Sequence, residues 1–82
     1  MGNVVSYELL QITEEKAIYK YFPEGEKEHY GVVVLERKNN VGHIERMDEV
    51  YPNSAYGFAV IRQLERYNKK NFFRDSGWIA LY

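Results

Sequence analysis

The side chains best suited to acid–base or metal chemistry in this sequence are its two histidines, His29 and His43. Imidazole titrates near neutral pH and is the commonest metal ligand, so a pair of histidines could form a site. Each begins a predicted strand, one over residues 29–37 and the other over 43–50. Antiparallel pairing across the intervening turn would place the two imidazoles at opposite ends of the hairpin. We therefore expect solvent-facing or strand-end histidines that share no site.

The acidic residues and hydroxyl groups give no stronger indication of chemistry. Glu24, Glu26 and Glu28 alternate in a charged loop but lack the Asp, Asn and Gly spacing of a calcium loop, so we interpret them as a solvated turn. No serine lies in a glycine-flanked elbow, and cysteine is absent. We predict no catalytic residue, metal, cofactor or enzymatic activity. An enzyme would require a pocket that brings one of the histidines to a carboxylate.

Positive charge gathers in one stretch of a chain whose formal net charge is −1. From residue 62 to residue 74, Glu65 is the single acidic residue against five basic ones: Arg62, Arg66, Lys69, Lys70 and Arg74. These cations could contact phosphates or an acidic partner. They could equally complement the dipole at the end of a helix and keep a small protein soluble.

The segment that should position this charge is residues 54–70, SAYGFAVIRQLERYNKK. Its spacing predicts an amphipathic helix. An apolar side containing Val60, Ile61 and Leu64 lies opposite a side containing Ala59 and the basic residues. Ser54 is the expected N-cap, because its hydroxyl can accept from an amide of the first turn.

The rest of the chain reads as short β-strands. Runs with β-type composition cover residues 4–12, 17–22, 29–37, 43–50 and 78–82, with turns between them. The fourth run is the most charged, which suits a sheet edge. Up-and-down connections, with the helix packing back over one face, place the last run beside the first. We predict an α+β fold, an antiparallel sheet of four to five strands in the order 5-1-2-3-4, with one helix on one face.

Length and composition limit the chain to a single domain over residues 1–82. The first residues lack the charged start and apolar core of a secretory signal, and no apolar run approaches a membrane span. We expect a cytoplasmic protein that does not associate with membranes.

Two apolar surfaces could bind a partner. Residues 78–82, WIALY, carry no charge at a predicted sheet edge, and Tyr19 and Tyr21 would form an exposed face if the helix covers Ile18 and Phe22. The leading hypothesis is an interaction module, either a homodimer or a binder of another protein. Its putative contact residues are Tyr19, Tyr21, Trp78, Ile79, Leu81 and Tyr82. The alternative is a nucleic-acid-associated regulator that uses the basic residues.

Overall fold

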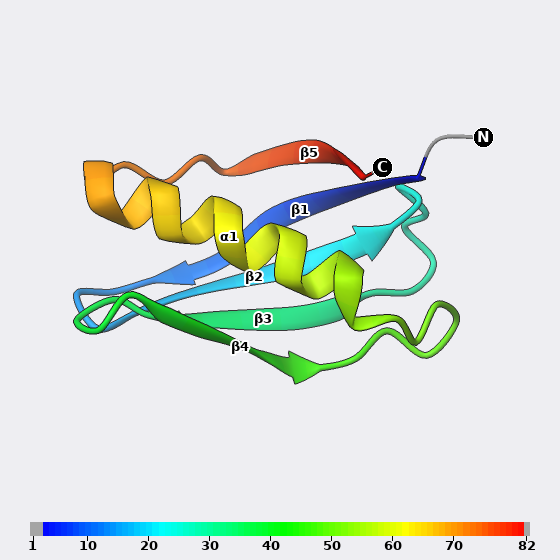
Figure 1. Ribbon diagram of the computed structural model, residues 1–82, viewed down its shortest axis with the longest axis horizontal. Helices are drawn as coiled ribbons and strands as arrows, with labels where there is room; N and C mark the ends of the chain where they lie inside the picture. Colours follow the sequence, from blue (N-terminus) through cyan, green and yellow to red (C-terminus); the bar gives the residue numbers. More distant parts are fainter. Residues whose placement is uncertain (1–2, 82) are drawn as a thin grey trace.

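The computed structural model describes residues 3–81 and contains five antiparallel strands and one helix (Figure 1). The elements are β1 (Asn3–Ile12), β2 (Lys16–Pro23), β3 (Gly31–Glu36), β4 (Val41–Arg46), α1 (Ser54–Lys70) and β5 (Ser76–Leu81). The strands form one sheet in the order β4-β3-β2-β1-β5. The α+β fold and the strand order expected from the sequence are therefore confirmed.

The helix covers one face of this sheet and crosses it diagonally, starting near β3 and β4 and ending near β5 (Figure 1). Side chains at alternate positions of the three central strands meet the apolar side of α1. The core includes Tyr7, Tyr19, Tyr21, Val33, Leu35, Val60, Ile61 and Leu64, all of them buried. No helix of residues 3–81 covers the opposite face of the sheet.

Helix α1 spans the predicted residues, but two details differ from the prediction. The N-cap is Asn53, whose side-chain oxygen accepts from the Ala55 amide at 2.9 Å, and Ser54 is the first helical residue. Ala59, expected on the solvent side, is buried and belongs to the core, so the apolar side of the helix is wider than the wheel suggests. At the other end, Asn71 adopts a left-handed conformation (φ 53°) and closes the helix.

Several strand boundaries also differ from those predicted. Strand β3 is shorter than residues 29–37, because His29 belongs to the preceding loop. Strand β4 occupies Val41–Arg46 instead of 43–50, because Asp48 turns into the protein, where its carboxylate accepts from the Tyr51 amide. Strand β5 begins at Ser76, two residues earlier than predicted. Both histidines therefore lie in places other than the starts of strands.

Candidate functional site

The candidate site is the outer edge of β5, one of the two edges of the sheet. Strand β5 pairs with β1 through residues 76–81, and no strand of residues 3–81 lies on its other side. Its sequence, SGWIAL, contains no charged residue and no proline. Outward-facing N–H and C=O groups of such a strand can pair with another chain. This edge lacks the side chains that usually prevent such pairing.

The other edge, β4, is protected by charge. Its exposed residues include His43, Glu45 and Arg46, with the His43 ring nitrogen 3.9 Å from the Glu45 carboxylate. Charged edge strands discourage pairing with other molecules. The prediction that this charged strand lies at an edge is confirmed, and the two edges differ sharply in character.

The residues of β5 alternate between the two faces of the sheet. Trp78 pairs in register with Ser6 on the uncovered face and keeps 69% of its surface exposed. Ile79 and Leu81 point to the helix side and pack partly against the core. Gly77 also lies on that side, and a Cβ there would come within 2.5 Å of the Tyr7 hydroxyl oxygen, so a larger residue would push β5 away. Tyr82, predicted to share this surface, lies outside the described residues.

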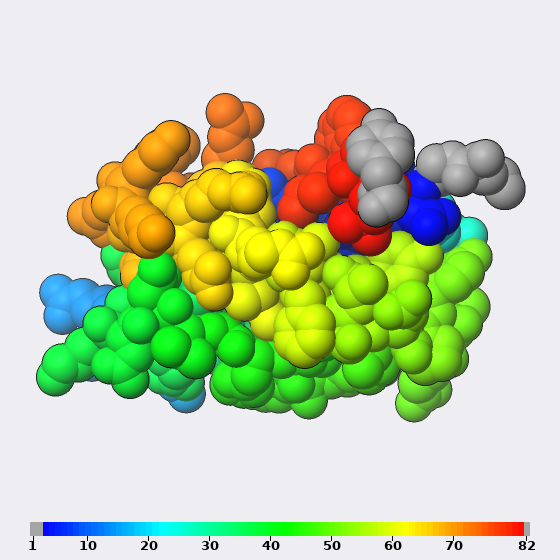
Figure 2. All heavy atoms as spheres, viewed as in Figure 1, coloured from blue at the N-terminus to red at the C-terminus, as the bar shows by residue number. Residues whose placement is uncertain are grey.

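Two open grooves run between α1 and β5. The larger, of about 380 Å³, is lined by Ala55, Ala59, Arg62, Arg66, Ile79, Ala80 and Leu81. The second, of about 320 Å³, is lined by Tyr7, Gln63, Tyr67, Arg74, Gly77 and Trp78. In Figure 2 the yellow side chains of α1 and the red ones of β5 form neighbouring parts of the same face. In the first groove, α1 presents two small side chains, Ala55 and Ala59, toward β5.

Three arginines border these grooves. Arg62 and Arg66 line the first and Arg74 the second. Within residues 3–81 none of them makes an ion pair, and Arg66 donates only to Gln63 Oε1, at 2.9 Å. The structure thus brings together two groups that the sequence analysis treated separately. The apolar residues predicted to contact a protein, Trp78, Ile79 and Leu81, lie beside the arginines predicted to contact phosphates or an acidic partner. The sequence did not indicate that these two groups share one edge.

The remaining basic residues are distributed unevenly. Lys70 joins Arg66, Arg74 and the exposed Phe72 around a smaller hollow of about 240 Å³ at the end of α1. Lys69 is exposed on the same helix but lines none of these hollows. It belongs to the last turn, where a cation is favoured by the helix dipole.

The prediction that Tyr19 and Tyr21 form an exposed face of the sheet is wrong. Tyr19 and Tyr21 are fully buried, because α1 covers their side of β2 and leaves Ile18 and Lys20 on the other. Their hydroxyls find partners at the margin of the core: Tyr19 donates to the Arg74 carbonyl oxygen, and Tyr21 accepts from the Asp48 amide at 3.1 Å. Neither side chain is available to a partner.

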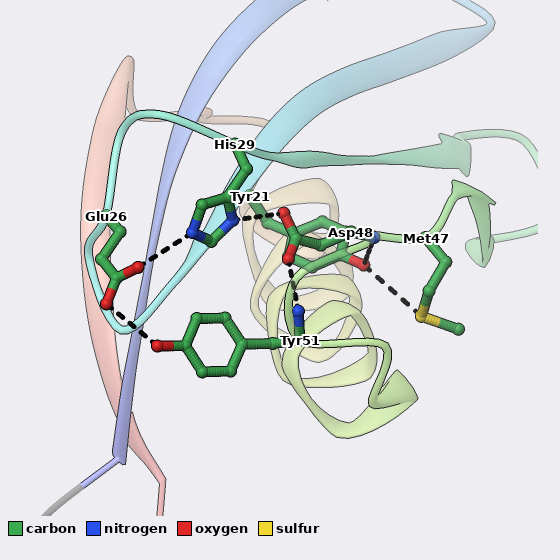
Figure 3. A network of polar contacts seen from close by, with 6 residues as sticks. All are labelled: Tyr21, Glu26, His29, Met47, Asp48 and Tyr51. Carbon is green, nitrogen blue, oxygen red and sulfur yellow. Dashed lines mark hydrogen bonds and ion pairs between the residues drawn. The ribbon is translucent and has the colours of Figure 1, made fainter.

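A second cluster of polar groups joins two loops at the end of the sheet (Figure 3). His29 lies between two carboxylates, with Nδ1 2.7 Å from Asp48 Oδ1 and Nε2 2.9 Å from Glu26 Oε1. Asp48 is fully buried and also accepts from the Tyr51 amide at 2.8 Å. Tyr51 in turn donates its hydroxyl to Glu26 at 3.0 Å. The loops after β2 and β4 are thereby fastened to each other.

The electrostatics of this cluster favour an ion bridge. Hydrogen bonds that His29 donates to Glu26 and then to Asp48 raise the pKa of His29 above its ordinary value. The bond from His29, followed by that from Tyr51, lowers the pKa of Glu26. Nearby, the hydrogen bond to Glu24 is the main cause that raises the pKa of Tyr56 to about 12. Glu24 and Glu26 are therefore partnered groups and not the solvated turn that the sequence suggested.

An enzyme was expected to require a pocket that brings a histidine to a carboxylate, and this cluster meets only part of that requirement. The fold does bring His29 to a carboxylate, but both ring nitrogens already contact carboxylates, which leaves neither free for a substrate. Within residues 3–81 no group of three metal-ligating side chains is placed to hold an ion. The cluster is best described as a fastening between loops. Sequence spacing did not reveal it, because the imidazole of His29 and the carboxylate of Asp48 are 19 residues apart and lie in different loops.

Comparisons with known proteins give no further indication: no family model matches the sequence, and neither the curated proteins nor the solved structures yield a match. Within the described residues no helix has the length and apolar character needed to cross a membrane.

Proposed function

We propose that this chain is a small cytoplasmic protein-binding module in which an extended segment of a partner adds to the sheet along the free edge of β5. The observation that carries the proposal is the contrast between the two edges. One is charged, and the other is uncharged and carries a tryptophan that is 69% exposed. Strand addition supplies affinity through main-chain hydrogen bonds and specificity through alternate side chains. The cytoplasmic location expected from the sequence is part of this proposal.

The surroundings of β5 supply the contacts that such a segment needs. Side chains of an added strand would alternate between the Trp78 side and the groove beside α1. Trp78 would offer a large aromatic surface, of the kind enriched at interface centres. Ile79 and Leu81, both half-buried, would continue the apolar floor of the groove under the added strand. The proposed contact residues are therefore Trp78, Ile79 and Leu81.

A homodimer through the same edge is the competing use of β5. Two copies paired through β5 would place Arg62 and Arg66 of both copies on the same side of the joined sheet, where like charges repel. A different chain avoids this repulsion, which is why we favour a partner other than a second copy. Sedimentation equilibrium distinguishes the two, because a dimer formed by the protein alone would contradict the proposal.

The proposal can be tested with a synthetic strand as probe. Trp78 is the only tryptophan in the chain, so its fluorescence reports directly on the proposed contact. We expect a peptide of about eight residues alternating Val and Thr to shift the Trp78 emission to shorter wavelength and to slow amide exchange in β5. The same peptide with alternate backbone nitrogens methylated should do neither, because it cannot pair with the edge.

Matched variants locate the effect on one edge. Ala80→Lys puts a charge on the β5 edge without removing the fluorescent reporter, and we expect it to abolish the shift. Val41→Lys places the same charge on the β4 edge and should leave the shift unchanged. Equal responses to the methylated and unmethylated peptides, or no response to either, would refute strand addition.

A second candidate function is binding of single-stranded nucleic acid. It is favoured by the hollow where Arg66, Lys70 and Arg74 surround Phe72, which is 65% exposed, since cations and aromatic rings together hold such strands. Its test is an oligonucleotide titration at rising salt. Binding must weaken steeply with ionic strength, and the absence of binding at low salt would remove this candidate.

A further inference from the structure

We propose that the segment received by β5 is acidic, with carboxylates at alternate positions that contact Arg62 and Arg66 in the groove beside α1. This inference rests on the proposed function and names the kind of partner that the site fits. It starts from the arginines that border the grooves, which make no ion pair within the part of the chain that is described.

The position of the arginines decides which side of the added strand should be acidic. Arg62 and Arg66 follow Ala55 and Ala59 along one stripe of α1, and this stripe forms the wall of the groove opposite Ile79 and Leu81. Every second side chain of an added strand would enter this groove, and the intervening ones would lie beside Trp78. The acidic residues are therefore expected at alternate positions, with apolar residues between them.

The repeat distances of helix and strand agree with this arrangement. Four helical residues rise about 6 Å, which separates Arg62 from Arg66 along α1. Two residues of a strand advance about 6.8 Å, which separates neighbouring side chains on one face. Two carboxylates at positions i and i+2 can thus face the two guanidinium groups at once. A guanidinium fork also binds a carboxylate through two parallel hydrogen bonds, which a point charge does not.

An acidic protein segment fits these observations better than a nucleic acid does. The free N–H and C=O groups of β5 alternate as donors and acceptors, which matches a peptide backbone, whereas a sugar–phosphate backbone offers phosphate acceptors without the alternating N–H donors. Among residues 3–81, the Arg62 and Arg66 groove is also lined by alanine, isoleucine and leucine, and these lining residues include no aromatic ring on which a base could stack. We therefore favour an acidic protein segment, and binding of a nucleic acid is one of the results that the experiment below can give.

The experiment uses three peptides of about eight residues that alternate Val with Glu, Thr or Lys, and follows Trp78 fluorescence. We expect the Glu peptide to bind about three- to tenfold more tightly than the Thr peptide, and the Lys peptide to bind more weakly than both. This advantage should shrink as NaCl rises, because the arginines are exposed. Arg62→Gln with Arg66→Gln should remove the advantage, so that the Glu peptide binds this variant no more tightly than the Thr peptide does.

Lys69→Gln is the matched control, since it removes a positive charge from the same helix outside the grooves, and it should preserve the advantage. Equal binding of the three peptides would overturn the acidic partner while leaving strand addition intact. A Glu-peptide advantage that survives backbone methylation would instead overturn strand addition. Tighter binding of a single-stranded oligonucleotide than of the Glu peptide, lost in the Arg62→Gln, Arg66→Gln variant, would replace the acidic segment by nucleic acid.

Discussion

The hydrogen bond between Tyr7 and Tyr67 offers a direct test of how the helix is fixed to the sheet. The two hydroxyl oxygens lie 2.5 Å apart and join β1 to the last turns of α1, across 60 residues of sequence. Tyr7 is 3% and Tyr67 7% exposed. Burial, and after it the bond to Tyr67, raises the pKa of Tyr7 well above its ordinary value, so the Tyr7 phenol is neutral at neutral pH.

The expected magnitude follows from this geometry. A neutral hydrogen bond stabilises a fold by about 1 kcal/mol, and a buried hydroxyl left without its partner costs about 1 to 3 kcal/mol. Both tyrosines line the groove beside Arg74, where water can reach a hydroxyl that has lost its partner. The cost of the unpartnered hydroxyl should therefore lie toward the lower end of this range. We expect Tyr7→Phe and Tyr67→Phe each to cost about 1.5 kcal/mol. The double variant should cost about 2 kcal/mol, which leaves a coupling of about 1 kcal/mol between the sites.

Urea denaturation of the wild type, both single variants and the double variant measures this coupling directly. For a domain of this size each single variant should also melt roughly 6 to 12 °C lower. Tyr30→Phe is the control, because Tyr30 lies on the uncovered face between Lys20 and Arg46, and it should change stability by less than about 0.5 kcal/mol. Strictly additive single effects would show that the two hydroxyls do not stabilise each other, which would contradict the hydrogen bond between Tyr7 and Tyr67.

Three further predictions concern other parts of the fold. Asn53→Ala should cost about 1 kcal/mol in thermal unfolding because it removes the N-cap oxygen, while Ser54→Ala should cost clearly less; equal losses would contradict the assignment of the cap. Gly31→Ala should destabilise the protein by about 1 to 3 kcal/mol, since the new Cβ would lie 2.1 Å from a carbon of a fully buried tyrosine ring, and unchanged stability would mean that this ring is not packed there. The His29 bridge should make stability depend on pH. Because Glu26 and the second carboxylate raise the folded-state pKa of His29, its contribution is complete below the unfolded value of about 6.5 and is lost as the pH rises through the folded value. Urea titrations above pH 6.5 should show this fall in the wild type and not in His29→Gln; identical profiles would exclude the bridge.

The helix and the strand order could be predicted from sequence because each depends on a local pattern. The 3.6-residue spacing of residues 54–70 located α1, although its N-cap is Asn53, one residue before the Ser54 expected. The strand order followed from the short turns, which force neighbouring strands to pair, and from the single crossing of the helix. Strand ends were less predictable, since Asp48 continues an alternating pattern yet leaves the sheet to hold the Tyr51 amide.

The buried tyrosines could not be predicted, because alternation separates two faces of a strand without saying which one is covered. On β2, Tyr19 and Tyr21 alternate with Ile18 and Phe22, so hydrophobicity alone favoured burying the second pair. The structure places the tyrosines under the helix and buries Phe22 on the other face beside Tyr30. Both tyrosine hydroxyls reach hydrogen-bond partners at the edge of the core. A buried tyrosine is tolerated when its hydroxyl is satisfied. Those partners come from the loops before and after α1, which no local pattern places.

The sequence also did not show that the arginines and the apolar residues of β5 form one site, because no local pattern places one element beside another. The arginines belong to a helical pattern and the apolar residues to a strand pattern, and their meeting depends on how α1 crosses the sheet. Ala55 and Ala59 explain the result physically: small side chains on this stripe leave the groove open, and Arg62 and Arg66 continue the stripe along its wall. Larger residues at those two positions would fill the space beside β5 and close its helix side to an added strand. The composition of this stripe, more than the net charge of the helix, therefore makes the β5 edge accessible and gives it a basic wall.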